Sequence, residues 1–181
     1  MGTQGGYNGG VGFELRDFRE EDFEALWQID QQCFAPGIAY SRAELAAYIR
    51  KAGSFTVVAQ PIPTEGRTPR NFHPGRSRIA GFIIAEVNRR GIGHIISIDV
   101  LPACRRSGLG SKLLREAENR LELLSCRAVT LETAVDNSAA LAFYKRQRYG
   151  VVKIIPRYYL NGVDALILEK RLSPKADARK Q

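Results

Sequence analysis

The residues with the clearest chemical potential form a loop between an apolar strand pattern and a helical pattern. We call this segment, Arg105–Gly110 with the sequence Arg-Arg-Ser-Gly-Leu-Gly, the glycine loop. Its two glycines, Gly108 and Gly110, let the backbone approach a ligand closely. The N–H groups of the following helix's first turn have no partner within the helix and attract phosphate oxygens. Because Arg105 and Arg106 add positive charge, we expect the loop to bind a pyrophosphate.

Taken alone, the glycine loop is also compatible with a plain strand-to-helix turn. It lacks the Lys-Ser or Lys-Thr pair of a P-loop that binds nucleoside triphosphates. It also lacks the third glycine and the downstream acidic residue of a dinucleotide-binding fold. Without agreement from other parts of the sequence, the plain strand-to-helix turn would therefore be the preferred interpretation.

Three side chains outside the loop have the chemistry to transfer protons. Glu132 lies in an alternating strand pattern, Tyr144 in a helical pattern, and His94 at the start of an apolar strand pattern. Each has a structural alternative. Glu132 could be a solvated strand carboxylate, Tyr144 a core residue packed beside Phe143, and His94 a strand-end residue with a structural hydrogen bond.

The hydrophobic periodicity predicts elements in the order β-α-α-β-β-β-α-β-α-β-β. The strands are expected at 11–16, 54–60, 78–87, 93–100, 128–134, 149–155 and 163–172. The helices are expected from an Asp17 cap to Cys33, from a Ser41 capping box to about Gly53, at 109–124 and at 138–148. These elements predict one mixed α+β domain that positions the glycine loop and the three candidate side chains.

The 181 residues are expected to form a single domain over residues 11–172. Residues 1–10 are expected to be a disordered Gly-rich tail, 61–77 a mobile loop between strands, and 173–181 a flexible basic tail. No apolar run approaches the roughly 20 residues that span a bilayer, and the N-terminus lacks the apolar stretch of a signal peptide. We therefore expect a cytoplasmic protein that does not enter membranes.

The formal net charge of +8 indicates an anionic partner without identifying it. No segment resembles a helix-turn-helix, a zinc finger or an RNA-binding sheet, which disfavours a nucleic-acid-binding module. The three cysteines, Cys33, Cys104 and Cys126, are far apart and form no zinc spacing with His73 or His94. We expect reduced thiols and no metal site.

Residues 93–172 resemble the second half of a GNAT acetyltransferase. The glycine loop matches the family's Gln/Arg-x-x-Gly-x-Gly/Ala motif, and Asn137 followed by a helix with Tyr144 matches another family feature. The resemblance is closest to the protein N-terminal amine acetyltransferases, including the RimI type. It rests there on the strand 93–100 and on the tyrosine pair at 158–159 followed by Asp164. The first half of the chain matches only in element order and hydrophobic pattern.

The resemblance implies a mostly antiparallel central sheet flanked by helices, with acetyl-coenzyme A as the cofactor. The family's cofactor strand splays from its neighbour and leaves backbone amides free, which would make Val100 the residue that polarises the thioester carbonyl, with Leu101 beside it. Asn137 would contact the pantetheine arm. The cofactor-binding residues implied in this way are Ile98, Val100, Leu101, Arg105, Arg106, Ser107, Gly108, Leu109, Gly110, Ser111 and Asn137.

The same resemblance implies catalytic and substrate-binding roles. Glu132 would be the base, acting through water, and Tyr144 would protonate the leaving thiolate. His94 matches a position used as a water-mediated base in archaeal relatives, which leaves the choice of base between it and Glu132. The residues implied to line a peptide groove are Tyr40, Tyr158 and Tyr159.

The acceptor implied by the resemblance is a primary amine, above all the N-terminal α-amine of a protein or peptide. A small-molecule amine, a lysine side chain and a non-catalytic acyl-coenzyme A sensor remain as alternatives, and the chain is expected to be a monomer or a homodimer. The chain also departs from the family pattern, because Arg148 stands where the family usually has a glycine after the last helix. We expect Arg148 to adopt a positive φ there.

Overall fold

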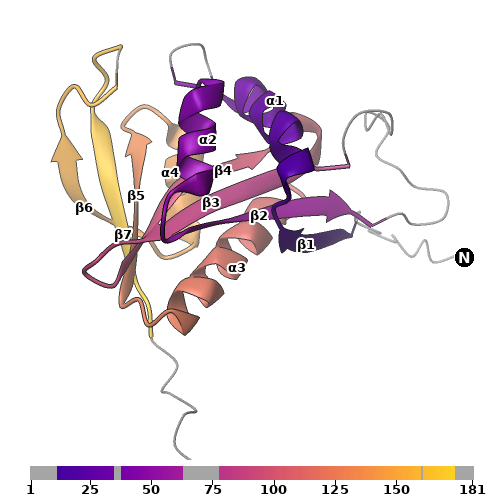
Figure 1. Cartoon of the computed structure of the whole chain (residues 1–181). Helices are drawn as coiled ribbons and strands as arrows, with labels where there is room; N and C mark the ends of the chain where they lie inside the picture. The colour runs from indigo at the N-terminus through magenta and orange to yellow at the C-terminus, as the bar shows by residue number, and fades with distance from the viewer. Residues whose placement is uncertain (1–11, 35–37, 63–77, 160, 174–181) are drawn as a thin grey trace, which may run out of the picture.

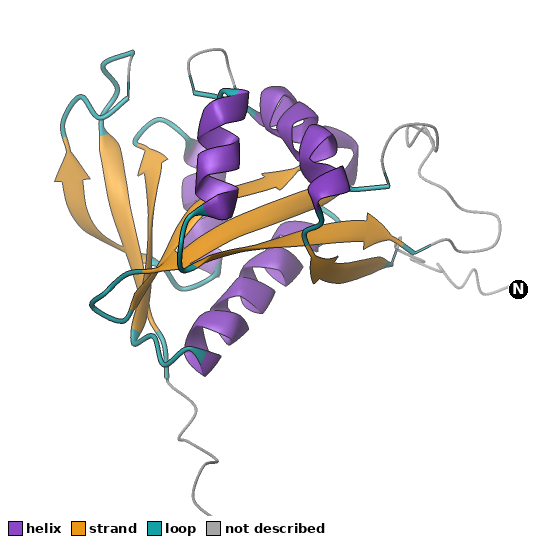
Figure 2. Ribbon diagram, in the orientation of Figure 1, coloured by secondary structure: helices purple, strands orange, loops and turns teal. Residues whose placement is uncertain are grey.

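The computed structural model of the chain describes residues 12–34, 38–62, 78–159 and 161–173. Seven strands form one sheet in the order β1-β2-β3-β4-β5-β7-β6 (Figures 1 and 2). The strands are β1 (Phe13–Asp17), β2 (Ser54–Pro61), β3 (Gly81–Val87), β4 (Ile92–Val100), β5 (Ala128–Ala134), β6 (Gly150–Ile155) and β7 (Ala165–Arg171). The helices are α1 (Phe23–Cys33), α2 (Arg42–Arg50), α3 (Leu109–Leu123) and α4 (Ser138–Arg146). The predicted element order and the mixed α/β class are confirmed.

Two hydrophobic layers cover the two faces of the sheet. The side chains of Phe82 and Ile84 on β3 pack with α1 and α2, whereas those of Ile83 and Ala85 pack with α3. All four are completely buried, because a central strand that is covered on both faces buries successive side chains on opposite sides. This double coverage explains the continuous apolar run in β3.

The sheet is antiparallel except where β4 meets β5. Those two strands run parallel and pair at only three positions, Ile92↔Ala128, Gly93↔Val129 and His94↔Thr130. Beyond this point β4 continues to Val100 and β5 to Ala134 without pairing with each other, and the two strands diverge (Figure 1). A bulge on β4 accompanies the divergence, since Ser97 pairs with Ile84 and Ile95 with Ala85, which leaves Ile96 unmatched.

The first helix begins later than the sequence pattern predicts. The expected cap, Asp17, is the last residue of β1, and a 3₁₀ turn at Glu20–Asp22 precedes the start of α1 at Phe23. The predicted Asp17 cap is therefore wrong. The polar residue that organises this turn is Asp22, whose carboxylate accepts a hydrogen bond from the Arg19 backbone N–H at 2.8 Å.

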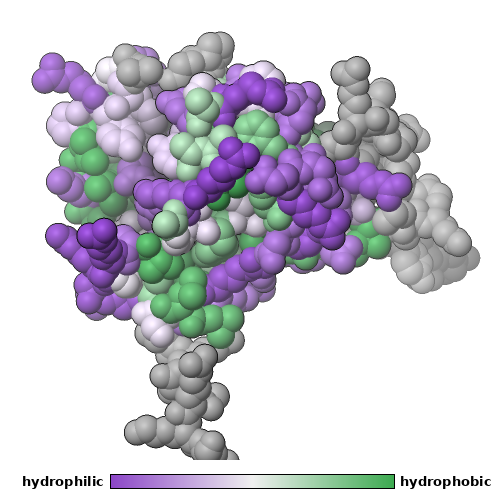
Figure 3. Space-filling model, in the orientation of Figure 1, coloured by the Kyte–Doolittle hydropathy of each residue, from purple (hydrophilic) through white to green (hydrophobic). Residues whose placement is uncertain are grey.

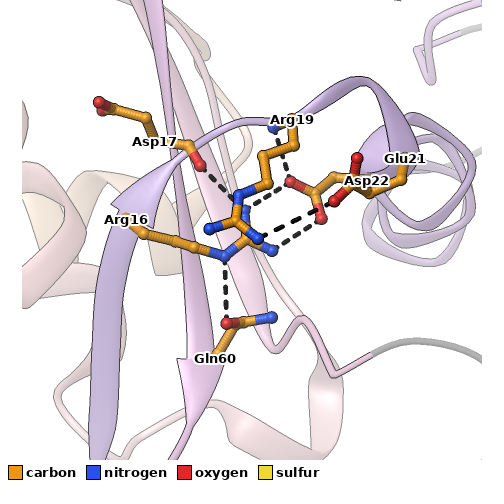
Figure 4. A network of polar contacts seen from close by, with 6 residues as sticks. All are labelled: Arg16, Asp17, Arg19, Glu21, Asp22 and Gln60. Carbon is orange, nitrogen blue, oxygen red and sulfur yellow. Dashed lines mark hydrogen bonds and ion pairs between the residues drawn. The ribbon is translucent and has the colours of Figure 1, made fainter.

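Asp22 is also the centre of a polar network that ties the turn to the sheet (Figure 4). Two guanidinium nitrogens of Arg16 donate to its two oxygens at 2.6 and 2.8 Å, and the Arg16 Nε donates to Gln60 of β2 at 3.1 Å. Asp22 is only 6% exposed, so this bidentate contact supplies partners that the buried carboxylate would otherwise lack. Burial alone would raise the pKa of Asp22, but the Arg16 contact together with the hydrogen bond and charge of Arg19 outweighs it and lowers that pKa.

The other helix ends are closer to expectation. Ser41 and Glu44 form the predicted capping box of α2, although that helix ends at Arg50 rather than near Gly53. Past the end of α4, Arg148 has a φ of 68°, which confirms the positive φ expected where the family usually has glycine. The Arg148 N–H donates to the Lys145 carbonyl, and the next N–H donates to Tyr144. These bonds close the helix despite the cost of a side chain in this conformation.

The last strand in the sheet order, β6, forms an edge that exposes apolar side chains. Val151, Val152 and Ile154 are each more than half exposed, and apolar atoms are visible at this edge in Figure 3. Lys153 lies between them, next to a register irregularity in the pairing of β6 with β7. A charge and a bulge on an edge strand are devices that oppose pairing with another sheet.

Most of the loop predicted at 61–77 and of the two predicted tails lies outside the described residues, as does the side chain of His73. Within the part of the chain that is described, no helix is both long and apolar enough to cross a membrane.

Candidate active site

The glycine loop leads into the start of α3, where the Leu109 N–H donates to the Ser107 hydroxyl at 3.4 Å and the next N–H groups have no acceptor within the helix. Gly108 caps the helix with a φ of +85°, and the first intrahelical bond runs from the Lys112 N–H to the Gly108 carbonyl at 3.0 Å. The Ser107 hydroxyl fixes the loop by donating to the Cys104 carbonyl at 2.7 Å. A Cβ built on Gly108 meets no atom within 4 Å. The site therefore leaves open space at a positive helix end, which fits a phosphate group.

Contacts on both sides fix the position of this helix end. The Arg105 Nε donates to the Val100 carbonyl at 3.1 Å, which ties the exposed loop to the end of β4. The Gln147 amide donates to the Ser111 hydroxyl at 2.9 Å, which ties α3 to the C-terminal end of α4. These two contacts hold the glycine loop and the first turn of α3 between the end of β4 and the end of α4.

One backbone amide of β4 is directed into the gap between the diverging strands. The Leu101 N–H donates to the Ala80 carbonyl at 2.9 Å and so faces the β3 side. Backbone groups alternate along a strand, so the N–H of the preceding residue, Val100, points to the opposite side, where β5 no longer pairs. The Val100 amide, rather than that of Leu101, is therefore the donor available in the gap. By the same alternation, the backbone groups of Ile98 face this side as well.

The two candidate bases contact each other where the strands separate. His94 Nε2 lies 2.7 Å from Glu132 Oε2, and His94 Nδ1 lies 3.7 Å from Glu86 Oε1. Burial alone would lower the pKa of His94. The hydrogen bond and charge of Glu132, together with the charge of Glu86, outweigh burial and raise that pKa above its ordinary value. Glu132 and His94 thus form a coupled pair, so neither can act as a base without affecting the other.

Tyr144 lies on the inner face of α4 and is 7% exposed. Its ring packs against Phe143 and Tyr149 in edge-to-face geometry. Burial, with smaller effects from the charges of Asp99 and Tyr159, raises the pKa of Tyr144. Its hydroxyl therefore stays protonated at neutral pH and can act as a hydrogen-bond donor.

Asn137 has a structural role, because its side chain accepts the Ala140 N–H at 3.1 Å and caps α4. Its predicted contact with a cofactor stays a prediction.

The predicted substrate-binding tyrosines come from two separate parts of the chain. The Tyr40 hydroxyl donates to the Ile96 carbonyl of β4 at 3.3 Å. Tyr158 and Tyr159 lie in the connection between β6 and β7, with ring centroids 5.1 Å apart. Burial raises the pKa of both phenols, and the charge of Glu132 adds to each rise. The charge of Tyr158 also contributes to the raised pKa of Tyr40, after larger effects that begin with burial, so the two aromatic groups are close in space.

Two acidic residues beside the base pair and the gap were not predicted. Asp99 is 1% exposed and accepts the Ser97 hydroxyl at 2.7 Å, and burial raises its pKa to about 7. An aspartate in an otherwise apolar strand is the signal that could have identified it. Glu86 gives no such signal, because its position opposite His94 depends on strand register.

Comparison with known proteins identifies the family. The model of the acetyltransferase (GNAT) family matches residues 15–149. The chain belongs to the GNAT acetyltransferase family. An uncharacterized N-acetyltransferase of Methanocaldococcus jannaschii is 38% identical over 158 residues, which cover 87% of this chain and 90% of that one. This GNAT chain is accordingly an N-acetyltransferase with a single mixed α/β domain.

More distant relatives match a shorter stretch or only the fold. An N-alpha-acetyltransferase of Sulfurisphaera tokodaii is 38% identical over 77 residues, which cover 42% of this chain and 46% of that one. The Escherichia coli ribosomal-protein-S18-alanine N-acetyltransferase superposes with a TM-score of 0.73 at 22% identity, covering 94% of this chain and 99% of that one. Arabidopsis thaliana NAA60 in complex with acetyl-CoA superposes with a TM-score of 0.71 at 20% identity, covering 89% and 99%.

Substitution of Gly110 tests the anion site without straining the backbone. A Cβ at Gly110 lies 3.6 Å from the Phe143 ring, an ordinary contact. We expect Gly110→Asp to fold normally, because a carboxylate in the first helical turn is favourable by about 0.3–1 kcal/mol. The same carboxylate should repel the pyrophosphate and weaken coenzyme A binding at least about tenfold, or 1.4 kcal/mol. Calorimetry measures the affinity, with neutral Gly110→Asn as the matched control. Equal affinity in both variants and the unmodified chain would contradict the assignment.

Proposed function

We propose that this chain transfers the acetyl group of acetyl-coenzyme A to the N-terminal α-amine of a protein or peptide. The observation that carries the proposal is the gap between β4 and β5. The His94–Glu132 pair lies where the gap opens, the Val100 amide is directed into it, and the N-terminus of α3 follows the end of β4. An acid–base pair, an oxyanion donor and a phosphate site thus follow one another along β4.

Acetyl-coenzyme A would supply the activated acetyl thioester. The glycine loop and the first turn of α3 would hold its pyrophosphate, and the side of β4 that carries Ile98 and Val100 would hold its pantetheine arm. The Val100 N–H would donate to the thioester oxygen as negative charge develops there. Because Arg105 ties the Val100 carbonyl to the glycine loop, the phosphate site and the oxyanion donor keep a fixed spacing.

The His94–Glu132 pair would remove a proton from the acceptor amine, directly or through water. An N-terminal α-amine has a pKa near 8 and a lysine near 10.4, so the α-amine gives up its proton to a much weaker base. The pKa of His94 is raised above its ordinary value of 6.5, which brings it closer to that of an α-amine. This match in basicity supports an α-amine rather than a lysine acceptor.

Two further observations support a peptide acceptor. The Tyr40 hydroxyl contacts β4 and the Tyr158–Tyr159 pair in the β6–β7 connection lies near Glu132, and aromatic side chains of this kind can line a groove for an extended peptide. The relative from Sulfurisphaera tokodaii is named an N-alpha-acetyltransferase. Tyr144 would donate its hydroxyl proton to the leaving thiolate; the burial that raises its pKa keeps this proton on the hydroxyl but also makes the phenol a weaker acid.

Acceptor choice is tested with paired peptides. We expect a peptide with a free α-amine and no lysine to be acetylated, and the same sequence with a blocked N-terminus and one lysine to react at least about tenfold more slowly at neutral pH. Mass spectrometry of the products distinguishes α- from ε-acetylation. Faster modification of the blocked lysine peptide would contradict the α-amine proposal, and modification of small amines alone would show a small-molecule acceptor.

The role of Tyr144 is tested by removing only its hydroxyl. We expect Tyr144→Phe to lower kcat by about 10²–10⁴-fold, as for other general acid–base steps, with coenzyme A affinity nearly unchanged. Tyr149→Phe is the matched control. Tyr149 is equally buried and donates to Glu118 at 2.9 Å, so its loss should cost about 1–3 kcal/mol of stability and leave kcat intact. Full kcat in Tyr144→Phe would reduce that tyrosine to a packing role.

A further inference from the structure

A row of charged side chains extends from the base pair across two more elements. His94 of β4 contacts Glu132 of β5 at 2.7 Å on one side and faces Glu86 of β3 at 3.7 Å on the other. The second oxygen of Glu86 lies 2.6 Å from the Lys51 ammonium, which follows the end of α2. Lys51, Glu86, His94 and Glu132 therefore alternate in charge when His94 is protonated.

The position of Glu86 is set by the sheet rather than by a flexible surface contact. Glu86 is the direct cross-strand partner of His94, and such partners lie about 4.5–5.5 Å apart at their Cβ atoms. Its side chain is 14% exposed, against 52% for Lys51. The Glu86 Oε2 atom is buried and accepts no hydrogen bond. Its contact with the Lys51 ammonium is therefore an ion pair only. Lys51 thus acts on Glu86 mainly through its charge.

We propose that Glu86 and Lys51 are positioning residues that set how readily the His94–Glu132 pair accepts a proton. The carboxylate of Glu86 stabilises the protonated imidazole and holds the ring toward Glu132. The ammonium of Lys51 offsets part of that negative charge. The catalytic consequence rests on the proposed function, whereas the electrostatic coupling between the residues does not.

The coupling predicts shifts of opposite sign. The charged groups that face His94 are Glu86 from β3 and Glu132 from β5, and Glu132 is in turn near the phenols of Tyr158 and Tyr159. Removing the charge of Glu86 takes away a group that favours the imidazolium, so the pKa of His94 should fall. Removing the charge of Lys51 leaves Glu86 uncompensated, so the pKa of His94 should rise. A merely structural role for either residue gives no reason for opposite shifts.

The test is an NMR titration of the histidine rings in the full chain. The chain has only two histidines, His73 and His94, and a His73→Asn variant assigns the two signals. We expect Glu86→Gln to lower the pKa of His94 by about one unit, and Lys51→Met to raise it by roughly half a unit, because Lys51 acts through Glu86. Arg50→Met is the matched control, because Arg50 pairs with Glu20 instead and should leave His94 unchanged. Shifts of the same sign, or none, would overturn the proposal.

The pH dependence of kcat/KM then distinguishes a failure of this inference from a failure of the proposed function. If the His94–Glu132 pair is the base, the acidic limb of kcat/KM should move to lower pH in Glu86→Gln and to higher pH in Lys51→Met, following the NMR values. Limbs that stay in place while the NMR pKa values shift would contradict the base assignment and leave the electrostatic coupling supported. Unshifted NMR values would overturn the coupling whatever the rates show.

Discussion

The separation of β4 from β5 determines how every other part of the site is arranged. Two parallel strands that pair at three positions and then diverge leave backbone groups that the sheet cannot satisfy. The unmatched Ile96 on β4 lies close to the point of divergence. Past the bulge, β4 keeps its antiparallel pairing with β3 up to Val100, so its remaining backbone groups face the gap in a fixed orientation. A ligand with amide and carbonyl groups can form hydrogen bonds with this edge of β4, as an added β-strand would.

The charged groups near the two ends of β4 differ. At the far end of β4, Arg105, Arg106 and the N-terminus of α3 form a positive surface suited to phosphates. At the near end, the carboxylates of Glu86 and Glu132 lie on either side of His94, and the Lys51 ammonium pairs with Glu86, so charges of both signs alternate there. The buried Asp99 lies between these ends, so its protonation near neutral pH limits the negative charge next to the Val100 amide. The net positive charge of the chain alone would not reveal this division.

The sequence predicted the features that depend on local spacing. The glycine loop, the element order, the Ser41 capping box and the positive φ of Arg148 all follow from residues near one another in the chain. Features that depend on register were missed. Glu86 could not be placed opposite His94, and the direct contact between His94 and Glu132 could not be foreseen. The predicted start of α1 is wrong because both Asp17 and Asp22 are residue types that cap helices. The contacts of Arg16 with Gln60 and Asp22 hold the turn before α1 at Asp22 instead.

Cofactor binding at this edge can be followed at individual backbone amides by titrating the ¹⁵N-labelled chain with coenzyme A and with acetyl-coenzyme A. We expect saturable shifts of Gly108 and Gly110 with either ligand, and a shift of Val100 that is larger with acetyl-coenzyme A because only this ligand has a thioester carbonyl oxygen. Binding that leaves these three amides unchanged and perturbs another face of the sheet would show that the cofactor does not bind between β4 and the start of α3.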